Sequence, residues 1–500
     1  MTELTTEAIR TAAANLELRT HAIIDGTATQ SLSGKTFTTE NPATGKMLAE
    51  ITECQEEDVD MAVDAARKTF ERGDWAKAAP SDRRRIMHRF ADLIYKHNME
   101  LALLETLEAG KPISECVNTD IHETAECIRW HADATDKIYD QVCPTGPDNL
   151  GMVIREPIGV VGAILPWNFP ALMAAWKLGP VLSMGNSLII KPAELTSLST
   201  IRLAELALEA GIPEGVFNVL PGQGAVAGQA IGRHKGVDAC AFTGSTVVGR
   251  KFLEYAAQSN LKRVVLELGG KSPQIVMPDV TDLDHVASHA ASAAFWNMGE
   301  NCSAGSRLLV HESLKEPLLE KLIAELHNNW VVGDPLDPNV MLGSMIEKKH
   351  MEKVLGFIET GHKEGAELRL GGKQVLKESG GYFVEPTIFD NVTNDMTIAR
   401  EEIFGPVLSV MTFKDEAEAI RLANETSYGL AASLHTENIH TAHRMARAIK
   451  AGTVSVNCFS EGDMTAPFGG FKQSGFGGRD KSLGAHDQYA ELKTVWYENR

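Results

Sequence analysis

Cys302 stands in the stretch FWNMGENCSAGSR, among small and polar residues, and no histidine is nearer along the chain than His289 and His311. A free thiol is only slightly ionised at neutral pH, but its thiolate is a strong nucleophile. A cysteine that attacks a carbonyl carbon needs a base, a donor for the oxyanion that forms, and room for the substrate. The alternative interpretation of Cys302 is a small buried core residue.

Two other residues are candidates for the base and the oxyanion donor. Glu267, in VVLELGGKSP, ends an apolar run typical of a strand and precedes two glycines. A crowded, partly desolvated carboxyl has a raised pKa, which suits a base that activates water. Asn168, in PWNFP, offers a side-chain NH₂ group. Each also has an ordinary interpretation, as a salt-bridged carboxylate or a turn asparagine.

The elements that must position these residues alternate from about residue 155 onward. Apolar strand-like runs are separated by amphipathic helical segments; the runs are IGVVGAILPW, NSLIIKP, GVFNVLP, DACAFTG and KRVVLELGG. Such alternation predicts an α/β fold with a parallel, doubly wound sheet, whose ligand site lies at the carboxyl ends of the strands. Residues 271–470 resemble a second α/β unit, and the residues before about 150 are mainly helical in pattern.

A dinucleotide site is expected at that sheet edge, but AILPWNFP stands where G-x-G-x-x-G usually follows the first strand. A later turn, AFTGSTVVGRKF, brackets a helix start with Gly244 and Gly249, where backbone N–H groups can approach a pyrophosphate. In IIKPAE, the carboxylate of Glu194 beside Lys191 can accept hydrogen bonds from the ribose hydroxyls of the adenosine. The same carboxylate would repel a 2′-phosphate, which favours NAD over NADP. The alternative interpretations are that Gly244 and Gly249 serve only helix packing, and that Lys191 and Glu194 form an ordinary solvated pair in a loop.

Composition narrows the class of protein. The 500 residues and a formal net charge of −19 indicate two or three domains and argue against nucleic-acid or anionic-membrane partners. The most apolar window, ALMAAWKLGPVLSMGNSLII, is interrupted by polar residues, and the first twenty residues lack a signal-peptide pattern. Seven scattered cysteines without a C-x-x-C pair argue against disulfides and structural zinc. We therefore expect a cytoplasmic protein without a metal centre.

Seven motifs in order resemble those of the NAD(P)-dependent aldehyde dehydrogenase superfamily: PWNFP, KPAE, FTGSTVVG, LELGGKSP, NMGENCSAGSR, EEIFGPV and PFGGFKQSG. The resemblance runs from TFTTENPATGKMLAEI to the C-terminus, which is nearly the whole chain. The missing glycine fingerprint is a trait of that family. GENC in place of the commoner GQxC is taken as a tolerated variant.

The resemblance implies a mechanism. Cys302 would attack the aldehyde to give a thiohemiacetal, whose oxyanion is held by Asn168 and the Cys302 N–H. Hydride transfer to NAD, with NADP less favoured, would leave a thioester that Glu267 hydrolyses through water, and Lys177 joins the catalytic set. The implied cofactor-binding residues are Ile164, Pro166, Trp167, Lys191, Glu194, Gly224, Gly228, Phe242, Gly244, Ser245, Val248, Gly249, Leu268, Gly269, Glu402 and Phe404.

The resemblance also implies the aldehyde dehydrogenase fold. A Rossmann-like NAD-binding domain would comprise residues 1–137 and 157–268, and an α/β catalytic domain residues 269–470. A small β oligomerisation extension would comprise residues 138–156 and 471–500, with YAELKTVWY as a strand. A homo-oligomer, dimer or tetramer, follows from the resemblance.

The substrate prediction rests on the segment from EGDMTAPFGGFKQSG onward, which resembles the bacterial branch acting on γ-glutamyl-γ-aminobutyraldehyde and 4-guanidinobutyraldehyde. Met173, Trp176 and Phe459 would line the substrate tunnel. Asp120, Glu461 and Asp463 would hold a cationic group at its mouth, unless they are ordinary surface charges.

Four alternative functions remain open at this stage. They are a broad-range aldehyde dehydrogenase, a CoA-acylating semialdehyde dehydrogenase, a catalytically retired structural protein and a nicotinamide-independent thiol hydrolase. Glu267 argues against the CoA-acylating branch, which characteristically lacks that base.

Overall fold

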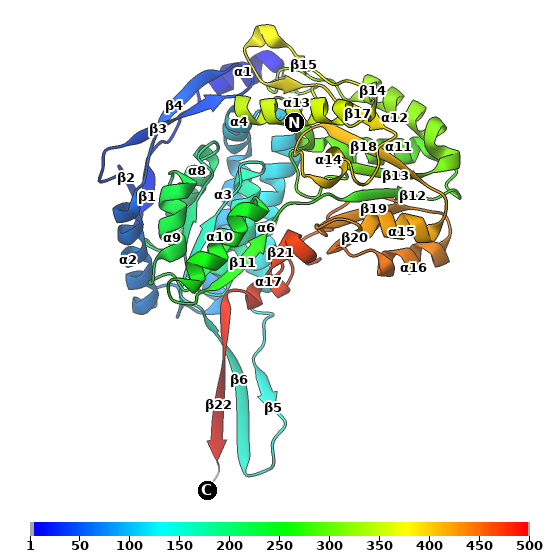
Figure 1. Cartoon of the computed structure of the whole chain (residues 1–500). Helices are drawn as coiled ribbons and strands as arrows, with labels where there is room; N and C mark the ends of the chain where they lie inside the picture. The colour runs from blue at the N-terminus through cyan, green and yellow to red at the C-terminus, as the bar shows by residue number, and fades with distance from the viewer. Residues whose placement is uncertain (1–4, 499–500) are drawn as a thin grey trace.

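The computed structural model describes residues 5–498, and its largest sheet has eight strands in the order β2-β1-β9-β8-β7-β10-β11-β21 (Figure 1). Five central strands are parallel: β7 (Val160–Ile164), β8 (Ser187–Lys191), β9 (Phe217–Val219), β10 (Ala239–Thr243) and β11 (Arg263–Glu267). The antiparallel edges are β1 (Ala22–Ile24), β2 (Thr27–Thr29) and β21 (Gly475–Phe476). The predicted order of strands along the chain is confirmed.

Helices cover both faces of this sheet, because alternate side chains of each strand point to opposite sides. Val161 and Ala163 of β7 pack with one group of helices, whereas Val160 and Ile164 pack with the other. The first group is α3 (Pro80–Lys96), α4 (Asn98–Ala109), α6 (Ile121–Ala134), α7 (Pro170–Ser183) and α8 (Leu198–Ala210). The second group is α2 (Glu56–Arg72), α9 (Gln229–Arg233) and α10 (Thr246–Ala257). Burial on both faces explains why the strands are almost wholly apolar.

The N-terminal third is not helical throughout. A hairpin of β3 (Thr36–Asn41) and β4 (Lys46–Thr52) covers the stretch TFTTENPATGKMLAEI, and α1 (Thr6–Ala14) precedes β1. Among residues 5–498, no helix is long and apolar enough to cross a membrane.

The second unit is a seven-stranded sheet in the order β14-β17-β18-β13-β12-β19-β20, parallel except for β14. Its strands are β12 (Pro273–Val276), β13 (Arg307–His311), β14 (Glu367–Leu370), β17 (Thr387–Asp390), β18 (Val407–Phe413), β19 (Ala431–His435) and β20 (Thr453–Val456). The helices that pack on it are α11 (Leu283–Phe295), α12 (Lys315–Asn329), α13 (Lys348–Lys363), α15 (Glu416–Asn424) and α16 (Ile439–Ala448). The α/β class is confirmed for both units.

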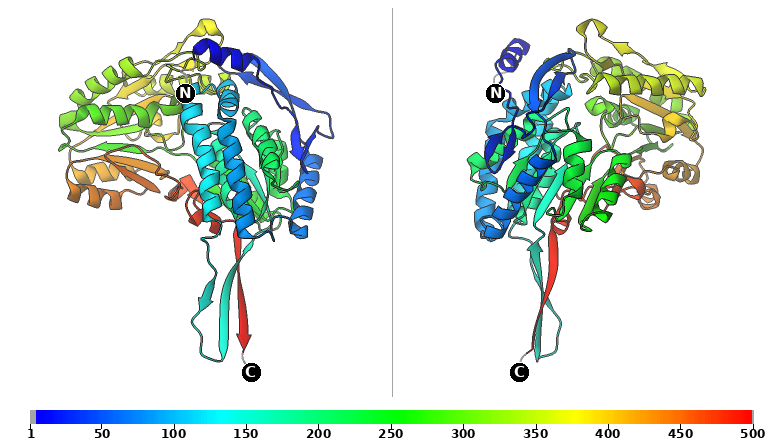
Figure 2. Two further views of the ribbon diagram at one scale, coloured as in Figure 1. Left: turned by 180° about the vertical axis from the view of Figure 1, so that it is seen from behind. Right: turned by 60° about the vertical axis from the view of Figure 1, so that its left-hand side comes forward.

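A three-stranded antiparallel sheet projects from the body as a stalk (Figures 1 and 2). It consists of β5 (Gln141–Cys143), β6 (Asn149–Pro157) and β22 (Ala490–Glu498), and β22 pairs with β6 along its whole length. The segment just before β22 lies against the body, where β21 pairs with β11. The domain boundaries given above stay a prediction.

Candidate active site

A cavity of about 490 Å³ lies where the two large sheets meet, and it collects most of the predicted site residues. Its wall includes the ends of β10 and β11, the loop after β7, the first turns of α7 and the segment around Cys302. The predicted residues that line it are Pro166, Trp167, Asn168, Met173, Trp176, Gly244, Ser245, Glu267, Leu268, Gly269, Cys302, Glu402, Phe404, Phe459 and Glu461. Residues far apart in the sequence therefore share one site.

Cys302 is held at this cavity by an unusual backbone turn. Asn297, Met298 and Gly299 all have positive φ angles, of 52°, 57° and 70°. A Cβ atom at Gly299 would lie 2.3 Å from the carbonyl oxygen of Gly405, so only glycine fits there. Burial raises the pKa of the half-buried Cys302 thiol, and the carboxyls of Glu461, Glu402 and Glu267 raise it further. The thiol is therefore protonated at rest.

Asn168 is fixed at both ends, which orients its amide. Its Nδ2 donates to the carbonyl oxygen of Glu300 at 3.0 Å. Its main-chain carbonyl oxygen accepts from Lys111 Nζ at 3.0 Å and from Asn297 Nδ2 at 3.3 Å. Because a carbonyl only accepts, the atom that faces Glu300 must be the nitrogen, and the second N–H of the NH₂ group stays free to serve the cavity.

Glu267 ends β11 and is 3% exposed. Within the described residues its carboxyl oxygens accept no well-formed hydrogen bond, and the nearby Gly470 N–H lowers its pKa only weakly. Burial raises its pKa well above the usual value, and the carboxylate of Asp480 adds to the rise, whereas Lys177 and Arg479 oppose it. A buried carboxyl with so little hydrogen bonding is unusual and marks this position as a candidate for chemistry.

Lys177 does not line the cavity. It is buried in an ion pair with Asp480, and both groups act on the charge state of Glu267. Its position is that of a residue that works through Asp480 rather than on a substrate.

The cofactor candidates that do not line the cavity lie at or after the carboxyl ends of β7, β8, β9 and β10; they are Ile164, Lys191, Glu194, Gly224, Gly228, Phe242, Val248 and Gly249. Lys191 Nζ is 3.2 Å from a carboxyl oxygen of Glu194 and 2.9 Å from the carbonyl oxygen of Gly222. A Cβ atom at Gly228 would lie 3.5 Å from Lys191 Cδ, whereas one at Gly224 would meet no atom within 4 Å.

The turn from β10 into α10 has the features that a pyrophosphate site needs. Gly244 has φ of +158°, and a Cβ atom there would lie 2.7 Å from the Phe242 ring. Ser245 caps α10 by accepting from Val248 N–H at 3.4 Å, and the helix begins directly at the cavity. A helix N-terminus beside small residues favours an anion. The residues present thus fit an extended dinucleotide that ends at Glu402 and Phe404.

Glu402 lines the cavity together with Gly269 and Phe404. Its Oε1 accepts from Gly270 N–H at 2.8 Å, and burial raises its pKa to about 7. Phe404 has φ of 59° and packs edge-on against Trp167, with ring centroids 5.2 Å apart.

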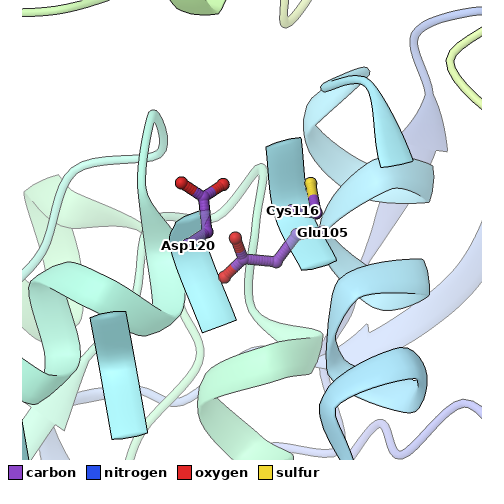
Figure 3. A group of neighbouring side chains, drawn as sticks. All are labelled: Glu105, Cys116 and Asp120. Carbon is purple, nitrogen blue, oxygen red and sulfur yellow. The ribbon is translucent and has the colours of Figure 1, made fainter. Parts of the chain in front are cut away.

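The prediction that Asp120 anchors a cation at the cavity mouth is wrong. Asp120 is fully buried, does not line the cavity, and pairs with Lys111 at 2.5 Å. Figure 3 shows it beside Glu105 and Cys116, from neighbouring helical turns. The π-helical turn Cys116–Asp120 directs this acid inward, where Lys111 compensates its charge.

Asp463 lies next to Gly462 of the cavity wall, and its role as a cation anchor stays a prediction. It is exposed and its carboxylate accepts from Thr465 N–H at 2.8 Å, within its own turn and outside the cavity wall. Glu461 does line the cavity, and its carboxylate contacts the hydroxyl of Ser303, next to Cys302.

Two charged residues that the sequence analysis missed line the same end of the cavity. Desolvation at the cavity wall raises the pKa of Glu123, the nearby Glu461 raises it further, and Lys481 lowers it. Lys481 is 3% exposed; its Nζ donates to the carbonyls of Glu461 and Gly462 and lies 5.2 Å from the centre of the Trp176 ring. No sequence signal separates Glu123 from Glu126 on the same helix, which contacts Tyr95 instead.

The comparison with protein-family models decides the family, because the model described as "Aldehyde dehydrogenase family" matches residues 28–495. The chain belongs to the aldehyde dehydrogenase family. It is an enzyme of the oxidoreductase class, and the family resemblance found in the sequence is confirmed.

Several characterised members of the family are similar over nearly the whole chain. Aminoacetaldehyde dehydrogenase of Pseudomonas aeruginosa is 54% identical, with 100% of each chain covered. The NADP/NAD-dependent aldehyde dehydrogenase PuuC of Escherichia coli is 48% identical, with 97% of each covered. The crystal structure of an indole-3-acetaldehyde dehydrogenase in complex with NAD⁺ has a TM-score of 0.98 at 52% identity, covering 99% of this chain and 100% of that one. The aldehyde dehydrogenase fold is thereby confirmed.

The raised pKa of Glu267 predicts how a Glu267→Gln variant behaves with pH. Above the ordinary glutamate pKa, the unfolded chain ionises Glu267 while the folded chain keeps it neutral, so the unaltered protein loses stability as pH rises. Glutamine has no such loss. The stability advantage of Glu267→Gln should therefore grow with pH, by at most about 1.4 kcal/mol per unit, as followed by thermal denaturation midpoints.

The control for this series is Glu359→Gln, at an exposed acid paired with Lys363. It should show no growing advantage. A flat difference between Glu267→Gln and the unaltered protein from pH 5 to 9 would contradict the buried neutral carboxyl.

Proposed function

We propose that the protein is an NAD-dependent aldehyde dehydrogenase that oxidises small aldehydes with a nitrogen-bearing tail to carboxylic acids. The observation that supports this best is that Cys302, Asn168 and Glu267 face one cavity. The dinucleotide-fitting turn lies at one end of it and the carboxylates of Glu123 and Glu461 at the other.

The residues divide the reaction among them. Cys302 Sγ bonds to the aldehyde carbon, and the thiol proton leaves to a nearby carboxylate. The free N–H of Asn168 stabilises the oxyanion. When bound, NAD⁺ supplies the hydride acceptor. Glu267 then takes a proton from the water that attacks the thioester, which releases the acid and returns the thiol. Burial keeps Glu267 neutral at rest, while Lys177 and Arg479 favour the carboxylate that this step needs.

The preference for NAD rests on Glu194. Lys191 already binds Glu194 and the Gly222 carbonyl, so it has little left to offer a 2′-phosphate. The solved relative with NAD⁺ supports this choice, and the relative described as NADP/NAD-dependent supports NADP as a second cofactor.

The substrate end of the cavity combines carboxylates with aromatic walls. Glu461 and Glu123 favour an ammonium or guanidinium on the aldehyde's tail, although Lys481 offsets part of their field. A solved γ-glutamyl-γ-aminobutyraldehyde dehydrogenase of Burkholderia cenocepacia, 52% identical with a TM-score of 0.97 over 99% of this chain and 100% of that one, supports nitrogen-bearing substrates.

The second candidate is a broad-range enzyme that also takes aryl-alkyl aldehydes. The specific observation that favours it is the aromatic part of the wall, which includes Trp176, Trp296 and Phe459. The retained Glu267 at the cavity disfavours a CoA-acylating enzyme, and the complete set of Cys302, Glu267 and Asn168 disfavours a retired structural protein. Thiol-ester hydrolysis without nicotinamide fits only as a side activity.

Assembly and location are further parts of the proposal. The stalk strand β22 exposes Leu492, Trp496 and Tyr497, so we infer that it joins a neighbouring subunit in a dimer or tetramer. The seven unpaired cysteines favour the reducing cytoplasm.

The first test is the rate of NADH formation across a panel of aldehydes, each with NAD and with NADP. The panel contains aminoacetaldehyde, γ-aminobutyraldehyde, its γ-glutamyl derivative, 4-guanidinobutyraldehyde, betaine aldehyde, indole-3-acetaldehyde, benzaldehyde and propanal. We expect kcat/KM at least tenfold higher for nitrogen-bearing aliphatic aldehydes than for propanal, about 1.4 kcal/mol of discrimination. Equal rates on propanal and benzaldehyde would favour the broad-range enzyme, and no NADH from any aldehyde would refute the proposal.

The role of Glu461 is tested by Glu461→Gln, which removes the charge and keeps the shape. We expect kcat/KM for γ-aminobutyraldehyde to fall roughly fivefold, in the range of one partly exposed ion pair, while the value for propanal is unchanged or rises. Glu359→Gln is the matched control, at an exposed acid that pairs with Lys363 and does not line the cavity. A parallel loss on both aldehydes would show that Glu461 does not recognise a cation.

The assembly is tested by Trp496→Glu in sedimentation velocity. A charge on the exposed apolar strand should shift the protein to smaller species, because the desolvation of that charge opposes association. Glu491→Gln, at an exposed acid paired with Arg263 near the base of the stalk, should leave the assembly intact. An unchanged assembly in Trp496→Glu would exclude β22 from the interface.

A further inference from the structure

Glu300 is a buried carboxyl beside Cys302 that no step of the proposed reaction uses. It is 1% exposed and follows the left-handed turn at Asn297–Gly299. It is also the residue by which GENC departs from the commoner GQxC. Burying an acid destabilises the folded protein unless its contacts offset the free energy lost on desolvation.

The contacts of Glu300 lead to the oxyanion donor. Its main-chain carbonyl accepts from Asn168 Nδ2 at 3.0 Å and from Asn297 Nδ2 at 3.0 Å. Its side-chain Oε1 accepts from Ile346 N–H at 3.1 Å. The residue thus ties the amide of Asn168 to the chain that enters α13.

The same chain segment reaches the cofactor end of the cavity. His350 Nε2 lies 3.7 Å from Glu300 Oε1 and 2.6 Å from the carbonyl oxygen of Phe404. Because that carbonyl only accepts, Nε2 carries the proton, and burial lowers the pKa of His350 to about 4. His350 is therefore neutral, and its ring packs edge-on against Trp167 with centroids 5.3 Å apart.

The charge state of Glu300 explains why the commoner form of this motif, GQxC, can have glutamine at the same position. Burial raises its pKa well above the usual value and Glu347 adds to the rise, against the Ile346 N–H bond and the cation of Lys111. A neutral carboxyl presents the same carbonyl acceptor as a glutamine amide. The position thus needs an uncharged acceptor of this length, and glutamate and glutamine both provide one.

We propose that Glu300 is a positioning residue for the oxyanion donor. Its carboxyl, anchored on Ile346 N–H, holds the segment 299–302 so that the Glu300 carbonyl orients the Asn168 amide and leaves one N–H for the oxyanion. This inference rests on the proposed function only in taking Asn168 as the donor. Loss of an oxyanion donor costs about 10²–10³ in rate, and a donor that is present but misdirected costs part of that.

The test is a double-mutant cycle between Glu300→Ala and Asn168→Ala. The measured quantity is the burst rate at which p-nitrophenyl acetate acylates Cys302, which needs the oxyanion pocket but no cofactor, and NADH formation is measured beside it. We expect Glu300→Ala to slow acylation about tenfold in the parent and less than about threefold in the Asn168→Ala background, because two residues that act as one unit are not additive. Glu300→Gln should restore most of the rate.

Glu108→Ala is the matched control. It removes another buried carboxyl that accepts backbone N–H groups, from Ser197 and Leu198, far along the chain from Cys302. It should lower the thermal midpoint without slowing acylation. If Glu300→Ala does not fold, Glu300→Met fills the space without an acceptor and is subject to the same expectations.

Equal slowing by Glu300→Ala in both backgrounds, or a Glu300→Gln variant as slow as the alanine variant, would overturn the inference. Absence of acylation in the unaltered protein would overturn it as well. A coupled acylation defect in a protein that forms no NADH would leave the inference standing while refuting the dehydrogenase proposal.

Discussion

The chain crosses from the eight-stranded to the seven-stranded sheet through Gly269 and Gly270, and no side chain fits at this crossing. A Cβ atom at Gly269 would lie 2.2 Å from Glu402 Oε2, and one at Gly270 would lie 2.2 Å from the carbonyl oxygen of Cys302. At Gly270 the backbone of the link lies directly against the backbone of Cys302, and at Gly269 it lies against the Glu402 carboxyl. This close approach accompanies the placement of Glu267, at the end of β11, and Cys302, before β13, on one cavity.

Around the crossing, the protein holds several carboxyls whose pKa values are raised by burial. Glu267 and Glu300 have strongly raised pKa values and are neutral at rest, whereas the pKa of Glu402 is raised to about 7, so that it is partly ionised near neutral pH. Cys302 shares this environment, in which burial and nearby carboxyls raise the pKa of its thiol. The thiol therefore ionises only when a proton acceptor takes its proton or the surrounding charge changes.

The sequence predicted the parallel strands and the chemistry at their ends well, because apolar runs, glycines and the motifs around Asn168, Glu267 and Cys302 depend on local pattern. It failed for acids whose role depends on which way a helix faces. Asp120 and Glu123 are three residues apart, yet Lys111 draws the first into the core while the second reaches the cavity. Lys481 and Glu300 were missed for the same reason, since only tertiary contacts reveal where their side chains end.

The cavity wall at residues 459–462 follows β20, the edge strand of the seven-stranded sheet, and is not part of the glycine crossing. Its bonds include Phe459 N–H to His289 Nδ1 at 3.2 Å, Ser455 Oγ to the Ser460 carbonyl at 2.6 Å and the Lys481 Nζ bonds to the Glu461 and Gly462 carbonyls. Changes in this loop can alter which tails fit without moving the link beside the reacting groups. In evolution, substitutions in this one loop can change the substrate specificity while the catalytic residues stay the same.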